Sequence, residues 1–256
     1  MTAQHGPEVD IWAYQGWLFD LDGVLTNTAE VHAAAWKQAF DGFLAKQEKR
    51  TGKTLAPFDP VADYQRYVDG EPRADGVVHF LAARGIELPA GADDDPQDAR
   101  TVAGLGNRKN HLLLQLLRTN GIDVYPGALA LVKALRSKGM PTAVVSASEN
   151  THAALTAGHI ADLFDAVVDG QVVKELRLAG KPAPDSYLEG ARRLGIPPGE
   201  AVVVEDALAG VEAGRAGHFG LVIGVDHQHH ADVLRAHGAD IVVTDLAELL
   251  DAGGSR

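Results

Sequence analysis

Two carboxylate side chains, those of Asp20 and Asp22, stand two residues apart in the octapeptide FDLDGVLT at 19–26. They come at the end of an apolar run that predicts a strand over 17–20. Side chains alternate between the two faces of a strand, so both carboxylates would point the same way at its carboxyl end. One could attack a phosphorus atom and form an aspartyl-phosphate, and the other could act as general acid and base. The alternative is an Asp-rich turn that only closes the strand.

Two serines follow a second apolar run, in the segment VVSAS at 144–148. The hydroxyl of Ser146 and the backbone N–H groups near it, at a strand end before a helix, suit an anion such as phosphate. Alternatively, Ser146 and Ser148 only cap the helix that begins near Asn150.

A lysine and an acidic pair complete the polar set. Lys181 lies in GKPAPD at 180–185, where two prolines hold the loop, and its charge would offset that of a phosphoryl group. Glu205 and Asp206 follow an apolar run and could hold Mg²⁺, which takes carboxylates together with phosphate oxygens and water. The alternatives are an ordinary surface lysine and a capped helix starting at Ala207. Taken together, the four segments supply what phosphoryl transfer needs.

Short apolar segments alternate with amphipathic ones from residue 125 onward, which predicts an α/β protein with a doubly wound parallel sheet covered by helices on both faces. The predicted strands are 17–20, 142–145, 166–168, 201–204, 220–225 and 241–243, and the helices are 128–138, 150–158, 183–194, 207–215, 231–237 and 245–251. Residues 29–123 are interpreted as a helical insert with helices over 29–43 and 107–118. We therefore expect a discontinuous core, 1–28 and 124–256, and an inserted helical cap domain, 29–123.

The composition excludes several classes of protein. The chain of 256 residues is 46% hydrophobic, enough for a large core, and its net charge of -12 argues against nucleic acid or an anionic membrane as partner. It has no cysteine, which excludes disulfides, thiolate catalysis and Cys-ligated zinc. We find no membrane span and no secretory signal in residues 1–15, and expect a cytoplasmic monomer. The His-rich segment 226–230 is interpreted as a solvated loop rather than a metal site.

The four polar segments, in this order, resemble the four motifs of the haloacid dehalogenase superfamily of phosphotransferases, whose core is a Rossmann-type α/β fold. The resemblance implies that Asp20 is the nucleophile and Asp22 the general acid and base. It implies that Mg²⁺ is held by the Asp20 carboxylate and the Asp22 backbone carbonyl, with further ligands from Glu205 and Asp206.

The resemblance also implies that Ser146 binds the transferring phosphoryl group and that Lys181 balances its charge. The carboxylate of Asp22 separates the chain from two branches of the superfamily. Dehalogenases lack a carboxylate at this place, and transport ATPases carry threonine there.

The opening DLDGVLTNTAEVHAAAWK at 20–37 is similar to that of the β-phosphoglucomutase subfamily. This closer resemblance implies a group of side chains that bind the substrate: Thr26, His32, Arg73, Lys109, Ser148 and Asn150. Thr26 would sit in the hinge, His32 would contact the acid/base Asp22, and Arg73 would clamp the phosphate that is not transferred. The chain departs from the subfamily in a longer cap, chiefly at 45–65 and 90–99.

The resemblance implies interconversion of β-D-glucose 1-phosphate and β-D-glucose 6-phosphate through an aspartyl-phosphate and a glucose 1,6-bisphosphate intermediate. Mg²⁺ would be the cofactor, glucose 1,6-bisphosphate the activator, and a small sugar phosphate the partner. One alternative is a Mg-dependent sugar-phosphate phosphatase of the same superfamily, in which water accepts the phosphoryl group. The other is a catalytically idle relative with a binding or regulatory role.

Overall fold

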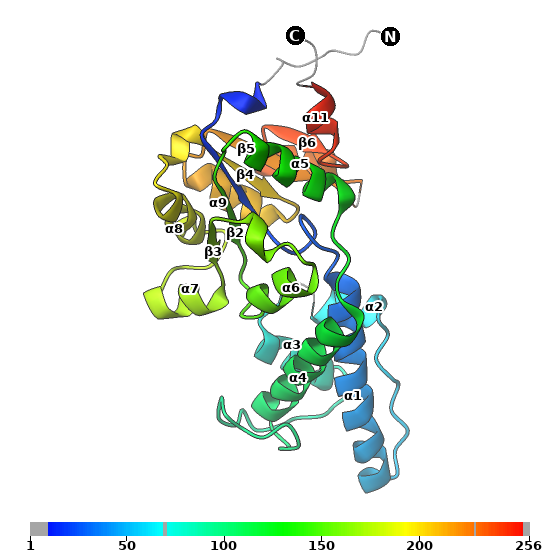
Figure 1. The fold of residues 1–256 in the computed structure, drawn as a ribbon. Coiled ribbons are helices and arrows are strands. Elements are labelled where there is room, and N and C mark those ends of the chain that lie inside the picture. The colour runs from blue at the N-terminus through cyan, green and yellow to red at the C-terminus, as the bar shows by residue number, and fades with distance from the viewer. Residues whose placement is uncertain (1–9, 69–70, 228, 253–256) are drawn as a thin grey trace, which may run out of the picture. The chain divides into compact units, whose positions relative to one another are not determined.

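The computed structural model describes residues 10–68, 71–227 and 229–252, which form two compact units. The first unit joins the described residues up to Asn27 with those from Ile122 onward, and the second is Thr28–Gly121 (Figure 1). The chain therefore leaves the first unit once and returns to it once. The boundaries expected from the sequence lie one and two residues further along the chain.

Within the described residues, the first unit contains a parallel sheet of six strands in the order β3-β2-β1-β4-β5-β6. The strands are β1 (Gly16–Phe19), β2 (Thr142–Val145), β3 (Ala166–Val168), β4 (Ala201–Glu205), β5 (Leu221–Val225) and β6 (Ile241–Val243). Because all neighbouring strands are parallel, their carboxyl ends share one edge of the sheet. β1 lies between β2 and β4, which puts Asp20 in the middle of that edge.

Helices cover both faces of this sheet, as the sequence predicted. They are α5 (Pro126–Ser137), α6 (Thr151–Ala157), α7 (Gly170–Leu176), α8 (Asp185–Leu194), α9 (Leu208–Ala216), α10 (Ala231–His237) and α11 (Glu248–Ala252). Trp17 and Phe19 pack in a cluster with Leu131 of α5, whereas Leu18 packs in a separate cluster with Tyr187 of α8. The alternation of side chains along β1 thus supplies both hydrophobic layers. The sequence did not predict α7.

The second unit is helical, with α1 (Ala29–Thr51), α2 (Ala62–Tyr67), α3 (Arg73–Ala82) and α4 (Val102–Asn120). The sequence predicted parts of α1 and α4 but missed α2 and α3. The last two turns of α1 carry mostly charged and polar residues, which weakens the apolar period there. Basic residues Lys49 and Arg50 in its last turn favour the helix by their charge, and Gly52 ends it in a left-handed conformation. Among the described residues, no helix has both the length and the apolar character needed to cross a bilayer.

An aromatic cluster forms the centre of this unit. The ring of Phe40 on α1 stacks on that of Phe80 on α3, with 3.8 Å between centroids, and on that of Trp36 at 4.8 Å. Phe58, from the irregular segment before α2, packs 5.4 Å from the Phe40 ring. Because Phe58 is fully buried, the segment that carries it is held across the helices.

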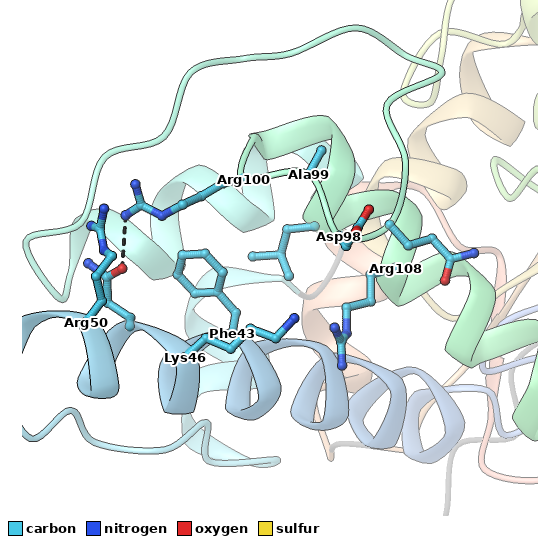
Figure 2. A pocket seen from close by; sticks show the side chains of 10 residues that line it. Phe43, Lys46, Arg50, Asp98, Ala99, Arg100 and Arg108 are labelled. Atoms are coloured by element: carbon cyan, nitrogen blue, oxygen red, sulfur yellow. Dashed lines mark hydrogen bonds between the residues drawn. The ribbon is translucent and has the colours of Figure 1, made fainter.

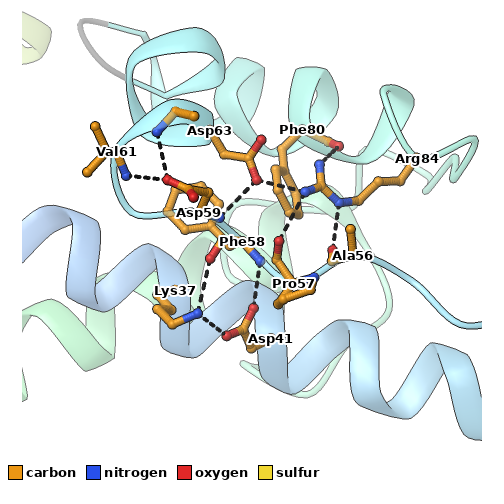
Figure 3. Close-up of polar contacts among 11 residues, drawn as sticks. Lys37, Asp41, Ala56, Pro57, Phe58, Asp59, Val61, Asp63, Phe80 and Arg84 are labelled. Atoms are coloured by element: carbon orange, nitrogen blue, oxygen red, sulfur yellow. Dashed lines mark hydrogen bonds and ion pairs between the residues drawn. The ribbon is translucent and has the colours of Figure 1, made fainter.

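Polar contacts clamp this irregular segment on both sides (Figure 3). The Arg84 guanidinium donates to the carbonyls of Ala56 and Pro57 at 3.1 and 3.3 Å, pairs with Asp63 at 2.7 Å, and lies over the Phe80 ring. On the other side the Phe58 N–H donates to Asp41. A single arginine therefore links three parts of the unit that are apart in the sequence.

We predict that Arg84→Gln lowers the free energy of unfolding by about 1–3 kcal/mol, because it removes the charged donor from Asp63 and from two backbone carbonyls. Urea unfolding of the whole protein would measure the change. Lys53→Gln is the matched control, since Lys53 is exposed, lies outside the helices, and its side chain makes no polar contact among the described residues. Equal stability of the two variants would contradict the clamp.

Candidate active site

Asp20 stands at the centre of the carboxyl edge of the sheet. Its neighbour Phe19 is in register with Val144 of β2 and Val204 of β4, and the Asp20 N–H donates to the Val204 carbonyl at 3.0 Å. The side chain is 8% exposed, so the carboxylate is largely withdrawn from water. Both neighbouring strands also end in residues that the sequence predicted for the site.

Lys181 connects these strand ends. Its Nζ donates to Asp20 Oδ1 at 2.5 Å, to Glu205 Oε1 at 2.6 Å and to the Val145 carbonyl at 3.3 Å. The alternative of an ordinary surface lysine is therefore wrong. This side chain is 15% exposed and its ammonium group uses all three of its hydrogens.

Glu205 is the most deeply buried of the acidic residues here, at 1% exposure. Its Oε1 accepts hydrogen bonds from Lys181 and from the Tyr187 hydroxyl, the latter at 2.8 Å. Its Oε2 accepts the backbone N–H groups of Asp206 and Ala207 at 3.1 Å each. These N–H groups precede α9, which has no side-chain cap, so Glu205 holds the turn before the helix and the helix-capping alternative is wrong.

The Asp206 carboxylate packs directly against Gly23. Gly23 has φ +80°, and a Cβ atom there would overlap the Asp206 carboxylate. One oxygen from each of Asp20, Glu205 and Asp206 lies within 4.8 Å of the other two. This group does not include the Asp22 side chain, for which the sequence predicted only a backbone ligand.

Two of the clustered carboxyl groups have raised pKa values. Burial raises the pKa of Asp20 to about 8, with further increases from the charges of Glu205 and Asp22 and a decrease from Lys181. Burial, then Glu205 and Asp20, raise the pKa of Asp206 to about 9. One lysine does not balance this many acidic groups.

The site therefore fits a divalent cation. Hard cations such as Mg²⁺ prefer carboxylate oxygens, and the three clustered carboxylates lie where an ion would also meet phosphate oxygens at the strand ends. A bound cation would lower the pKa of Asp20 and Asp206 and so keep Asp20 ionised for attack.

The serines predicted to bind phosphate form a turn after β2. Ser146 is buried, and its Oγ accepts the N–H of Ser148 at 3.1 Å. The Oγ of Ser148 accepts the N–H of Asn150, also at 3.1 Å, a contact within the turn before α6 and not a side-chain cap of that helix. Each hydroxyl still has its hydrogen to donate, because a hydroxyl accepts and donates at once.

Thr26 closes the loop that carries the two aspartates. Its side chain is fully buried, and its hydroxyl donates to the Leu21 carbonyl at 3.2 Å. It also bridges to Val124, where the chain re-enters the first unit. The side chain is therefore buried and its hydroxyl is engaged within the first unit, whereas the sequence predicted it among the substrate-binding residues.

The second unit brings two of its predicted residues together. Lys109 Nζ lies 3.3 Å from His32 Nδ1 and 5.0 Å from the Trp36 ring centroid. Burial and the Lys109 charge lower the pKa of His32 to about 3, so the imidazole is neutral and its Nδ1 accepts from the lysine. Arg73, at the start of α3, packs its stem against Gly106 of α4, one turn before Lys109.

The sequence missed three residues that support the site. Tyr187 holds Glu205, and Gly210 of α9 leaves room for that carboxylate, because a Cβ there would overlap it. His227 Nε2 lies 2.8 Å from the Gly23 carbonyl, and its ring stacks on Tyr125 at 4.8 Å. The His-rich segment is therefore not only solvated, since His227 fixes the aspartate loop. Gln228 lies outside the described residues.

Comparison with known proteins agrees with the geometry. The sequence model of the haloacid dehalogenase-like hydrolases matches residues 14–218. The chain belongs to the haloacid dehalogenase superfamily. Within the superfamily it is 52% identical over 236 residues to a β-phosphoglucomutase of Mycobacterium tuberculosis, covering 91% of this chain and 90% of the relative. This likeness identifies it with the β-phosphoglucomutase subfamily.

Two other members of the superfamily are more distant than this relative. Hexitol phosphatase A of Escherichia coli is 33% identical over 92% of this chain and 93% of its own. The crystal structure of a β-phosphoglucomutase from Clostridium difficile shares the fold, with a TM-score of 0.69 at 23% identity, covering 92% of this chain and 93% of that one. A haloacid dehalogenase enzyme with the fold expected from the sequence is thus established.

We predict that Gly210→Ala displaces the Glu205 carboxylate, because the added methyl group would occupy its place. Overpacking of this kind costs about 1–3 kcal/mol of unfolding free energy, and the loss of the contact between Lys181 and Glu205 would lower turnover as well. Gly199→Ala is the matched control, since a Cβ there meets nothing within 4 Å. Similar urea midpoints and turnover for both variants would contradict this packing.

We also predict that Mg²⁺ binding releases protons at about pH 7, because that pH lies below the raised pKa values of Asp20 and Asp206. The release should disappear as the pH rises past about 9, and the apparent affinity for Mg²⁺ should increase over the same range. Calorimetry in buffers of different ionisation enthalpy would measure it. Asp206→Asn should release fewer protons, and a buffer-independent heat at about pH 7 would be the contrary result.

Proposed function

We propose that this enzyme interconverts β-D-glucose 1-phosphate and β-D-glucose 6-phosphate. The single observation that carries the proposal is the 52% identity, over nine-tenths of both chains, to a β-phosphoglucomutase. The carboxylate and lysine cluster in the first unit and the Lys109–His32 pair in the second support it. We further propose that the enzyme is a cytoplasmic monomer, that it acts on small sugar phosphates, and that it has no nucleic-acid or membrane partner.

In the proposed reaction Asp20 Oδ attacks a phosphoryl group of glucose 1,6-bisphosphate. The new P–O bond to Asp20 forms while the P–O bond to the sugar oxygen breaks, and Asp22 gives that oxygen a proton. When the transferred group comes from O1, the product glucose 6-phosphate leaves. The 6-hydroxyl of incoming β-D-glucose 1-phosphate then loses its proton to Asp22 and takes the phosphoryl group from Asp20. This regenerates glucose 1,6-bisphosphate, which turns round so that its O1 phosphoryl group faces Asp20.

Charge balance is the main requirement of this transfer. Lys181, already bonded to Asp20, would offset the charge of the equatorial phosphoryl oxygens, and the Ser146 hydroxyl would donate to one of them. Mg²⁺, when bound by Asp20, Glu205, Asp206 and the Asp22 carbonyl, would supply further positive charge. Glucose 1,6-bisphosphate would serve as activator because it phosphorylates Asp20 without net turnover.

The second unit would select the sugar phosphate. Arg73 would bind the phosphate that is not transferred, since a guanidinium donates two parallel hydrogen bonds to such a group. Lys109, Ser148 and Asn150 would contact the sugar and its phosphate, and the neutral His32 would contact Asp22. A closed cap would exclude water, which otherwise hydrolyses the aspartyl-phosphate.

A sugar-phosphate phosphatase is the second candidate, and one observation favours it. The 33% identity to hexitol phosphatase A shows that this fold also occurs in a protein with that name. The two reactions share Asp20, Asp22 and Lys181 and differ only in whether a sugar hydroxyl or water accepts the phosphoryl group.

We predict that the enzyme, given Mg²⁺, β-D-glucose 1-phosphate and a trace of glucose 1,6-bisphosphate, forms glucose 6-phosphate with little free phosphate. Both products would be followed in the same reaction. Phosphate released in step with substrate loss would instead establish the phosphatase.

The control variant is Asp20→Asn, which should lose at least about a thousandfold in turnover for either reaction, because it removes the nucleophile. Full activity of this variant would refute the chemistry for both candidates. Absence of both products with the unmodified enzyme would instead support the catalytically idle relative.

A further inference from the structure

A cationic pocket lies within the second unit, and none of the residues assigned to the reaction lines it (Figure 2). It is a cavity of about 120 Å³ between α1, α4 and the loop that ends at Thr101. Its principal lining side chains are those of Phe43, Lys46, Arg50, Arg100, Leu105 and Arg108. Parts of this lining come from the two segments, 45–65 and 90–99, in which the cap departs from the subfamily.

The charges of this pocket are unusual for a chain of net charge -12. Four of its lining residues are cationic, whereas Asp98 is the one acidic residue that lines it. Lys46, Arg50 and Arg108 form no hydrogen bond or ion pair with any part of the chain that the structure describes. Arg100 donates only to the neutral Gln47 side chain, at 2.9 Å. The positive charge is therefore not neutralised from within the described protein.

Arg108 is the residue that points most directly to a ligand. Its Nε is buried and has no acceptor, which is costly for a charged donor. The guanidinium lies against Gly42 of α1, where a Cβ atom would come within 3.0 Å of Nη2. A second cavity, of about 300 Å³, also borders Arg108, so the guanidinium has space beside it. A bound anion would supply the missing acceptor.

The pocket wall is held in place before any ligand arrives. The Asn107 side chain donates to the carbonyls of Asp93 and Asp95, both at 2.9 Å, and the Thr101 hydroxyl donates to the Asp95 carboxylate at 2.5 Å. These contacts fix the loop that contains Asp93 and Asp95 to α4. The Asp95 carboxylate accepts from the Thr101 hydroxyl, does not line the pocket, and forms no ion pair with its cations among the described residues.

We propose that this pocket binds a small anion with two phosphoryl groups, with Arg108 as its anchor. Lys46 and Arg50 stand one turn apart on α1 and Arg100 comes from the loop, so positive charge is available on two sides. Guanidinium groups match phosphate oxygens with paired donors. Phe43 and Leu105 add an apolar surface for an organic part of the ligand. The site is separate from Lys109, which points to His32 and Trp36, and does not depend on the proposed function.

The test uses inorganic pyrophosphate and ADP as probes, in calorimetric titrations of the whole protein at low salt and without Mg²⁺. We expect a binding event that weakens at least about tenfold in Arg108→Gln, as expected from the loss of a charge-assisted bond. Arg100→Gln changes an exposed residue, and should weaken the same event even if Arg108→Gln fails to fold. Arg118→Gln, on the same helix but outside the pocket, should leave it unchanged.

Lys181→Gln separates this event from binding at the strand ends, and should leave the Arg108-dependent event in place. Tighter binding of ADP than of pyrophosphate would identify a nucleoside diphosphate as the ligand class, and the reverse order a bisphosphate without an aromatic ring. Unchanged titrations in both Arg108→Gln and Arg100→Gln, or loss of all binding in Lys181→Gln, would overturn the proposal.

Discussion

The contact of one ammonium group with two carboxylates is the interaction on which the rest of the first unit depends. Lys181 Nζ lies 2.5 Å from Asp20 and 2.6 Å from Glu205, and both acids are largely buried. Without that charge the carboxyl edge of the sheet would gather acidic groups that burial alone would keep protonated. With it, a single bound divalent cation would be enough to keep Asp20 ionised, and the fold brings together three carboxylates that could hold one.

Room for these carboxylates comes from glycine. Gly23 lets Asp206 approach the aspartate loop, and Gly210 lets Glu205 turn back over the start of α9. At both positions a methyl group would occupy the space of a carboxylate oxygen. The register of β1 between β2 and β4 then sets where the acids stand. Tyr187 and His227 act on the same arrangement from outside, by holding Glu205 and the Gly23 carbonyl.

Aromatic packing, rather than a charge cluster, stabilises the second unit. Stacked aromatic rings around Phe40 give it a centre, and Arg84 ties the irregular segment to that centre. On this support α4 presents adjacent residues to different surroundings, with Lys109 against His32 and Arg108 against Gly42. Successive side chains leave a helix in different directions, which is why these two neighbouring cations have separate surroundings.

The sequence by itself determined the parallel α/β core, because short apolar strands buried on both faces leave a pattern that survives without tertiary information. It also determined which side chains end β1, β2 and β4, since strand ends of a parallel sheet share one edge. Only the tertiary structure decided that Lys181 donates to both Asp20 and Glu205, that Thr26 is buried, and that Tyr187 and His227 support the site. These contacts join residues up to 204 positions apart. Their geometry follows from packing, which no local pattern of residues encodes.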